Sequence, residues 1–183
     1  MSRSVAIIVG PGVGNEYEAI RQSLEYFGLQ VTMSYLGRPN HFLELIGGKR
    51  PDIQHCSHWI LSLHGEDGRF ILPELAEEVY TREEPRSPLS AKDILAHGSF
   101  NQQVILNTGC TLGQKAVGEA FLRRGAKAYI GARDYVEGNA SLLFIIRFYY
   151  EWITHNKTEW QAFQAAKGID QETALFTFYG NQV

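Results

Sequence analysis

A histidine and a cysteine, each next to a glycine, lie at the ends of two apolar stretches of this sequence. His64-Gly65 follows "WILSL" (59–63), and Gly109-Cys110 comes directly after "VILNT" (104–108). A thiol and an imidazole that face one substrate are the groups that acyl transfer needs. The glycines allow close approach of the backbone, so that the N–H groups of Gly65 and Cys110 can contact the oxygen that gains negative charge.

The elements that must position this pair are visible as alternating strand and helix patterns. Strands are predicted at 5–9, 29–36, 59–63, 104–108, 126–132 and 174–180, and helices after Asn15 and at 114–124, 140–154 and 158–167. This alternation predicts an α/β fold, with a mostly parallel six-stranded sheet and helices on both faces. Ligands bind beyond the carboxyl ends of such strands, so His64 and Cys110 face each other if their strands are neighbours.

Local signals mark several helix ends. Asn15 with Glu18 resembles a capping box at the start of the first helix, and Gly28 is placed to end it. Thr158 with Gln161 predicts a second capping box. Cys110 precedes the helix at 114–124, and a helix N-terminus near an imidazole favours the nucleophilic thiolate.

Residues 65–103 form an insertion between the third and fourth predicted strands. Pro73 and Ser90 are each suited to begin a short helix in it. The segment is long enough to form a lid over a site at the strand ends.

Composition narrows the classes of protein that fit. The 183 residues suit a single domain, 1–183, and a formal charge of −3 provides no basic surface for nucleic acid. Cys56 and Cys110 form no C-x-x-C pair, which favours free thiols in a reducing compartment. "VAIIV" is too short for a signal-peptide core, and "SLLFIIRFYYEWI" is too short and too charged to span a bilayer, so a cytoplasmic protein is predicted.

Several segments resemble the caspase-like (clan CD) cysteine peptidases, and most closely the bacterial CHAT domains. "SLHGEDG" resembles the family's strand-His-Gly element, and "VILNTGCTLG" resembles its strand-Cys-x-x-Gly element. "SPLSAKDIL" and "AVGEAFLRRGAKAYIGARDYV" are similar to the CHAT segments that flank the nucleophile strand, and "GNEYEAIRQSLEYFGLQV" to the family's first helix and second strand. The resemblance spans nearly the whole chain and implies a three-layer caspase-like fold.

The same resemblance implies roles for the residues that carry it. His64 corresponds to the general base and acid, Cys110 to the nucleophile, and the backbone amides of Gly65 and Cys110 to the oxyanion hole. The implied reaction is hydrolysis of peptide bonds in a peptide or protein substrate through a thioester, without a metal or an organic cofactor. An inactive interaction module that binds a peptide or protein partner is the alternative function.

Three other motifs have simpler interpretations. "GPGVG" (10–14) lacks the third glycine of a dinucleotide loop and is predicted to be a tight turn, and "HCSH" (55–58) lacks a second ligand cluster and is predicted to be a loop without metal. Asp134 follows the strand 126–132 and is a candidate partner for a basic substrate side chain, although an ion pair with Arg133 is at least as good an interpretation.

Two further interpretations stay open. An amidotransferase-like α/β protein also places its cysteine on a sharp turn, but it needs a histidine after the cysteine with a nearby carboxylate, and "HNK" (155–157) does not supply this pattern. The stretch 174–180 is predicted to be an edge strand, which could pair with its counterpart in a second subunit.

Overall fold

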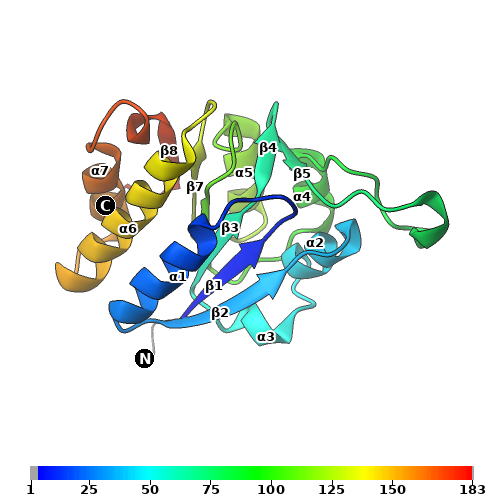
Figure 1. Ribbon diagram of the computed structural model, residues 1–183, viewed down its shortest axis with the longest axis horizontal. Helices are drawn as coiled ribbons and strands as arrows, with labels where there is room; N and C mark the ends of the chain where they lie inside the picture. Colours follow the sequence, from blue (N-terminus) through cyan, green and yellow to red (C-terminus); the bar gives the residue numbers. More distant parts are fainter. Residues whose placement is uncertain (1–3, 183) are drawn as a thin grey trace.

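A six-stranded sheet forms the centre of the molecule, within the residues 4–182 that the computed structural model describes (Figure 1). The strand order is β2-β1-β3-β6-β7-β8. The strands are β1 (Ser4–Val9), β2 (Gln30–Tyr35), β3 (His58–Ser62), β6 (Val104–Asn107), β7 (Ala128–Ala132) and β8 (Phe176–Gly180). All neighbours pair in parallel except β7 and β8, which are antiparallel, so the predicted mostly parallel six-stranded sheet is confirmed.

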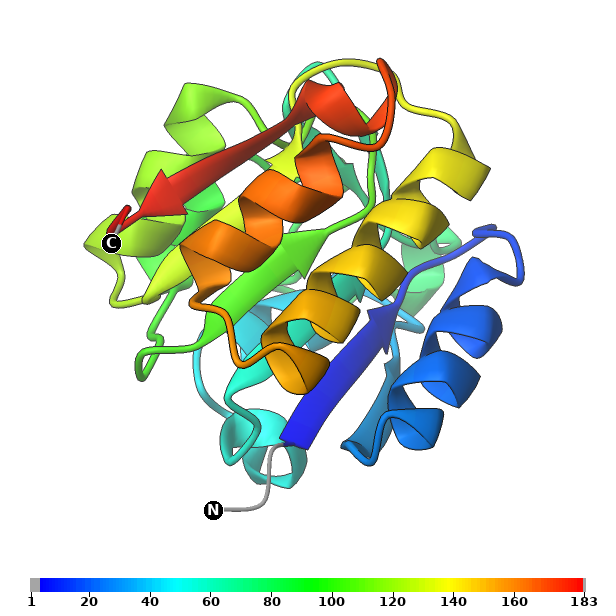
Figure 2. The same ribbon diagram turned by 90° about the vertical axis from the view of Figure 1, so that its left-hand side faces the viewer.

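Helices cover both faces of this sheet, as predicted. One layer consists of α1 (Glu16–Tyr26), α6 (Gly138–Thr154) and α7 (Glu159–Lys167), which Figure 2 shows in front of the sheet. The other layer consists of α2 (Pro39–Ile46), α4 (Ala91–His97) and α5 (Lys115–Arg123), together with the short α3 (Pro51–Gln54). A 3-10 turn, η2 (Thr173–Leu175), leads into β8.

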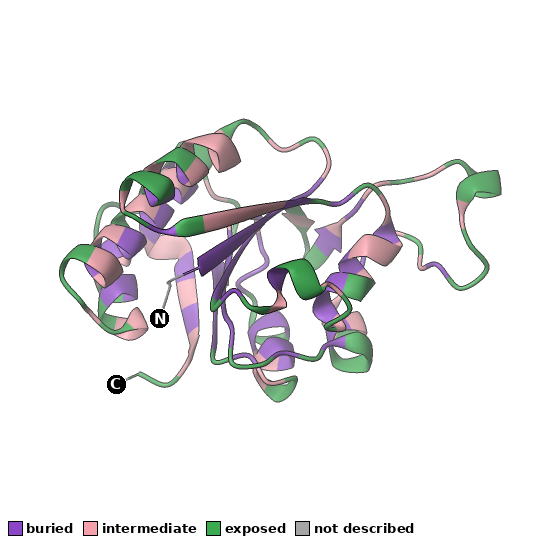
Figure 3. Cartoon of the chain, turned by 90° about the horizontal axis from the view of Figure 1, so that it is seen from below, coloured by how far each residue is buried: buried purple, intermediate pink, exposed green. Residues whose placement is uncertain are grey.

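The central strands are apolar throughout because helices bury both of their faces. In β1, Val5 and Ile7 pack toward the layer of α1 and α6, whereas Ala6 and Ile8 pack toward the layer of α2 and α5. All six residues of β1 are buried. Figure 3 shows the buried strands between the two helix layers.

The predicted helix ends have mixed outcomes. Thr158 and Gln161 form the predicted capping box of α7, and Gly28 follows α1 with a positive φ of 85°. The capping box predicted at Asn15 and Glu18 is wrong, because the Asn15 side chain makes no capping hydrogen bond. The main-chain oxygen of Asn15 accepts the N–H of Glu18 instead, at 3.1 Å.

The insertion forms a hairpin and a projecting loop before α4. The hairpin pairs β4 (His64–Glu66) with β5 (Arg69–Ile71), and a 3-10 turn, η1 (Glu77–Val79), lies near the end of the loop. α4 begins after Ser90, as predicted, and Ser90 also forms a capping box with Asp93. The helix predicted at Pro73 is wrong, because residues 73–76 are irregular. The helix expected after Asn15 does begin at Glu16, although no side chain caps it, whereas Pro73 begins no helix.

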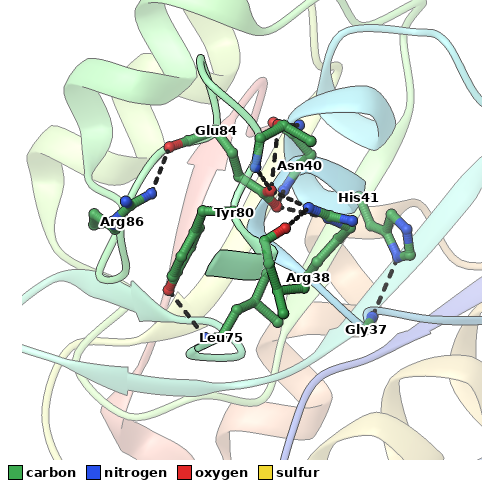
Figure 4. A network of polar contacts seen from close by, with 10 residues as sticks. Gly37, Arg38, Asn40, His41, Leu75, Tyr80, Glu84 and Arg86 are labelled. Atoms are coloured by element: carbon green, nitrogen blue, oxygen red, sulfur yellow. Dashed lines mark hydrogen bonds and ion pairs between the residues drawn. The ribbon is translucent and has the colours of Figure 1, made fainter. Parts of the chain in front are cut away.

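A buried carboxylate connects the projecting loop to the start of α2 (Figure 4). The Glu84 side chain is 0% exposed and accepts hydrogen bonds from the Arg38 guanidinium and from the N–H groups of Asn40 (3.1 Å) and Thr81 (3.2 Å). These bonds, chiefly those from Arg38, lower the pKa of Glu84 to about 2. The loop is therefore anchored to the start of α2 by a charged group that loses its partners if the loop detaches.

Glu84→Gln is expected to lower the free energy of unfolding by about 2 kcal/mol at pH 7, because a buried charge-assisted network loses its charge. The folded-state pKa is lowered, so the contribution of Glu84 is fully present above its ordinary pKa of 4.5 and disappears as the pH falls toward about 2. Urea unfolding at several pH values should therefore show the two proteins converging below pH 4.5.

The matched control for this experiment is Glu77→Gln in the same loop. The Glu77 side chain is 79% exposed and pairs with Arg86, so its replacement should change stability by less than about 1 kcal/mol at every pH. If the free energy of unfolding varies with pH in parallel for wild type and Glu84→Gln, the assigned role of the Glu84 carboxylate is contradicted.

No helix between residues 4 and 182 has both the length and the apolar character that a bilayer-spanning segment requires. The longest apolar candidate from the sequence is α6, whose buried residues pack against the sheet and α7.

Candidate active site

His64 and Cys110 lie beyond the carboxyl ends of two adjacent strands, β3 and β6. Leu61 is paired with Asn107 in the parallel register, and His64 and Cys110 each follow three residues later. The register continues past the strands, because the N–H of Thr108 donates to the carbonyl of Leu61 at 3.1 Å. His64 and Cys110 therefore lie at the same edge of the sheet on neighbouring strands, as the sequence predicts.

A cavity of about 290 Å³ opens between these strand ends. It is lined by His64 and Cys110 and by residues of the segments that follow β1, β3, β6 and β7: Val13, Gly14, Glu16, Leu63, Thr108, Gly109, Val136 and Gly138. His64 is exposed and Cys110 is half-buried, so both side chains are accessible to a ligand. Residues 72–90 line no part of this cavity, and the lid predicted for the insertion is not formed over it.

The imidazole of His64 is oriented by the turn that follows β1. Its Nε2 lies 3.0 Å from the carbonyl oxygen of Gly12, in the predicted tight turn of "GPGVG". A carbonyl oxygen only accepts hydrogen bonds, so Nε2 carries the proton of the neutral ring and Nδ1 carries the lone pair. Gly12 has a φ of 67°, which favours glycine at the position that presents this carbonyl. His64 is thus held in the tautomer whose Nδ1 can accept a proton.

The Cys110 thiol donates to the carbonyl oxygen of Val136, with the sulfur 3.8 Å from that oxygen. Within residues 4–182, no hydrogen bond joins this thiol to the His64 imidazole. The thiol and the imidazole therefore share a cavity without a hydrogen bond between them in the described part of the chain. Contacts of this kind commonly tighten only when a substrate is bound.

Gly65 lies directly against the turn that carries Cys110. A Cβ atom at Gly65 would be 2.3 Å from the carbonyl oxygen of Cys110 and 2.5 Å from the Leu112 side chain. In the β4–β5 hairpin, Phe70 stands opposite Gly65, and its N–H and C=O both bond to Leu89. The main-chain groups of Gly65 therefore face away from β5. Because Gly65 has no side chain, the hairpin can approach the turn that carries Cys110 this closely.

The amides beside Cys110 are occupied, whereas its own amide is not. The N–H of Gly109 donates to Asn107 Oδ1 at 2.8 Å, and the N–H of Thr111 donates to the carbonyl of Asp134 at 3.1 Å. The amide of Cys110 has no hydrogen-bond partner among the residues that the structure describes. Thr111 has a φ of 60°, and its hydroxyl accepts the N–H of Gly68 at 3.0 Å. This strained turn keeps one N–H group free next to the thiol.

Glu16 is a charged residue of the cavity that the sequence analysis did not select. It lies in the first turn of α1, and its carboxylate accepts a hydrogen bond from Ser62 at 3.1 Å. Glu16 lines the cavity together with His64 and Cys110. In the sequence it resembles any acidic residue at a helix start, and only its position next to the end of β3 distinguishes it.

Asp134 occupies a different position from the one that a substrate partner in this cavity needs. It is exposed, it does not line the cavity, and its Oδ1 accepts the N–H of Tyr135 at 2.8 Å. No ion pair with Arg133 is found in the described part of the chain. Its main-chain oxygen holds the N–H of Thr111, so the residue supports the cysteine turn through its backbone.

The "HCSH" segment differs from its prediction. His58 is the first residue of β3, is buried and stacks on Trp152 with a ring-centroid distance of 4.1 Å, so the segment is not wholly a loop. Cys56 is buried, and burial raises the pKa of its thiol. Across residues 4–182, no group of three or more His, Cys, Asp or Glu side chains is arranged to hold a metal ion.

Comparison with solved structures connects this fold to cysteine peptidases. Gingipain R (RgpB), an Arg-specific cysteine proteinase, matches 98% of this chain with a TM-score of 0.61 at 13% sequence identity. Separase of Saccharomyces cerevisiae, in its complex with securin, matches 98% with a TM-score of 0.59 at 14% identity. The complex of the pro- and mature domains of Porphyromonas gingivalis RgpB matches the whole chain with a TM-score of 0.60 at 12% identity.

These similarities establish the fold. This chain has the caspase-like α/β fold, and it spans 46% of the gingipain chain and 12% of the separase chain. No protein-family model and no curated protein sequence matches it. The closer resemblance to CHAT domains, inferred from sequence segments, stays a prediction.

Proposed function

We propose that this chain is a cysteine endopeptidase in which Cys110 is the nucleophile and His64 is the general base and acid. The observation that carries the proposal is the shared cavity at the ends of β3 and β6, into which both residues are brought by the strand register. The caspase-like fold, which the chain shares with two cysteine peptidases, supports the same reaction.

The reaction proceeds in two stages. Nδ1 of His64 takes the thiol proton, and the Cys110 sulfur attacks the peptide carbonyl while the carbonyl electrons move to the oxygen. The backbone N–H groups of Gly65 and Cys110 stabilise this oxyanion, and its collapse breaks the C–N bond as His64 protonates the leaving amine. Water, deprotonated by His64, then hydrolyses the thioester and releases the acid and the free thiol. The reaction requires a rotation that takes the thiol from Val136 to the imidazole.

The test is covalent labelling with a peptidyl chloromethyl ketone, followed by mass spectrometry of the digested protein. Cys110 should be labelled and Cys56 should not, because Cys56 is buried. His64→Ala should abolish the labelling. Equal labelling of the two cysteines, or labelling of Cys110 that does not depend on His64, would refute the dyad. A protein whose biological activity survives Cys110→Ala would instead be an interaction module.

We propose further that the substrate carries a basic residue at the cleavage position. A carboxylate in the cavity wall, Glu16, is held by Ser62 and is available to pair with a guanidinium or an ammonium group. Gingipain R, which has the same fold, is Arg-specific. Asp134 remains a second candidate for this role, although it lies outside the cavity lining.

Glu16→Gln is expected to lower kcat/KM for a peptide with Arg at the cleavage position by about tenfold or more, because a charged hydrogen bond is lost from the complex. Rates for neutral peptides should stay within about twofold. Asp134→Asn tests the second candidate: a loss of the Arg preference in this variant and not in Glu16→Gln would assign the role to Asp134. Equal wild-type rates for Arg, Lys, Asp and neutral peptides would remove the proposed preference.

The partners proposed from the sequence are a peptide or protein substrate and a second copy of the chain. The separase and RgpB complexes each contain a protein partner, securin or the pro-domain, which supports protein recognition by this fold. β8 lies at the edge of the sheet, as the edge-strand prediction requires. Pairing of two such edges, a cytoplasmic location and a dyad that needs no cofactor remain proposals.

A further inference from the structure

Two tyrosine hydroxyls hold successive carbonyl groups of the turn that carries Cys110. Tyr129 donates to the carbonyl oxygen of Leu112 at 2.9 Å, and Tyr179 donates to that of Gly113 at 2.8 Å. Tyr129 comes from β7 and Tyr179 from β8, the edge strand near the end of the chain. β7 and β8, which contribute no side chain to the cavity, thus contact the cysteine turn through these two hydroxyl groups.

The approach of Tyr179 depends on a glycine inside a helix. Gly118 lies in α5, where glycine is unfavourable relative to alanine, and a Cβ atom there would be 2.2 Å from the Tyr179 ring. The ring therefore crosses α5 at a position that only glycine leaves open. Gly118 weakens the helix, but it leaves the space through which the Tyr179 side chain reaches Gly113.

The turn also lies unusually close to β7. A Cβ atom at Gly113 would be 2.0 Å from the carbonyl oxygen of Gly131, and the N–H of Gly113 donates to the carbonyl of Ala132 at 2.6 Å. The N–H of Thr111 bonds to the segment after β7, at Asp134. The amides of Thr111 and Gly113 are therefore held by main-chain carbonyls, and the carbonyls of Leu112 and Gly113 are held by the two tyrosines.

Both hydroxyls are suited to permanent donation. Burial raises the pKa of Tyr129 and of Tyr179, so each phenol stays protonated across the neutral range. Tyr129 is fully buried and stacks on Phe121 with a ring-centroid distance of 4.5 Å, which fixes the ring that presents its hydroxyl.

We infer that Tyr129 and Tyr179 are positioning residues, which hold the Cys110–Gly113 turn so that the free amide of Cys110 points to the substrate oxyanion. This inference rests on the proposed peptidase function. Leu112 and Gly113 are buried, so carbonyls released from the tyrosines lose partners that water does not readily replace. Thr111 is in the left-handed region, and the turn is expected to relax from it when the carbonyls are freed.

The test compares Tyr129→Phe, Tyr179→Phe and the double variant with wild type. Each change removes one oxygen and keeps the ring. In peptide hydrolysis, kcat should fall by about tenfold or more in each single variant while KM stays unchanged, because a displaced oxyanion donor acts only on the transition state. Alkylation of Cys110 by iodoacetamide displaces iodide without forming an oxyanion, so its rate should stay within about twofold of wild type.

Tyr149→Phe is the matched control. Tyr149 is also fully buried, and its hydroxyl bonds to His58 Nδ1 at 3.2 Å on the other face of the sheet, so it reports the general effect of removing a buried hydroxyl. This control should keep the wild-type kcat. Hydrogen exchange provides a readout that does not need activity: the amides of Thr111 and Gly113 should exchange at least about tenfold faster in Tyr179→Phe than in Tyr149→Phe.

The outcomes separate the two proposals. If wild type hydrolyses peptides and the Tyr129 and Tyr179 variants keep its kcat, or lose no more than Tyr149→Phe, the positioning role is overturned. If wild type hydrolyses nothing, the peptidase proposal fails, and the exchange rates still decide whether the tyrosines hold the turn. Unchanged exchange at Thr111 and Gly113 overturns the inference in either case.

Discussion

Cys110→Ala is expected to lower kcat/KM for peptide hydrolysis by at least about 10⁴-fold, because no other group in the cavity can form the thioester. The side chain is half-buried and alanine is smaller, so the free energy of unfolding should change by about 1 kcal/mol or less. Hydrolysis of a fluorogenic peptide measures the first quantity, and urea unfolding measures the second. His64→Ala should cause a loss of similar size, since the two residues act as one unit.

Cys56→Ala is the control for this loss. Cys56 is buried away from the cavity, so its replacement should preserve the rate per folded molecule even if it lowers stability. A Cys110→Ala protein that retains more than about 1% of the wild-type kcat/KM would exclude Cys110 as the nucleophile, because removal of a nucleophile costs far more than hundredfold. A loss of activity in Cys56→Ala and not in Cys110→Ala would assign the nucleophile to Cys56 instead of Cys110.

Gly65→Ala is expected to lower kcat by about hundredfold or more. The new methyl group would lie 2.3 Å from the carbonyl oxygen of Cys110, and that oxygen belongs to a turn with little freedom to move. The methyl group therefore pushes the β4–β5 hairpin and the cysteine turn apart, which separates the two N–H groups of the oxyanion site. Steady-state kinetics on a peptide ester and on an amide should show the loss in kcat.

Gly168→Ala provides a matched glycine substitution at the end of α7. A Cβ atom at Gly168 has its nearest neighbour at 3.4 Å, and the residue has a φ of −83°, so alanine fits. Its kcat should equal that of wild type. Wild-type activity in Gly65→Ala would show that the hairpin does not pack against the turn as described, and would remove Gly65 from the proposed oxyanion site.

The sheet and its helices were predictable because their signals are local. Apolar runs such as 5–9 and 104–107 occur where both faces of a strand are buried, and the capping residues Ser90 and Thr158 bond to backbone within three residues. The errors have the same origin. The Asn15 side chain is of a type that caps helices, but it makes no capping hydrogen bond here. His58 belongs to a polar motif, but in the folded chain it is buried against α6.

The pair His64 and Cys110 was also predictable, since each follows a strand directly and parallel strands end at one edge of a sheet. The hydrogen bond from the Cys110 thiol to Val136 could not be predicted, because the carbonyl of Val136 comes from another turn. Glu16 could not be selected from the sequence, since acidic residues are common in the first turn of helices.

The order of strands and helices along the chain and the glycine-flanked histidine and cysteine follow from the amino-acid sequence, because these are properties of short segments. Which groups surround the histidine and the cysteine depends on the folded chain. Tyr179 and Gly113 are separated by 66 residues, and His64 and Gly12 by 52. Such contacts depend on the packing of strands and turns in three dimensions, and they leave no periodic pattern in the amino-acid sequence.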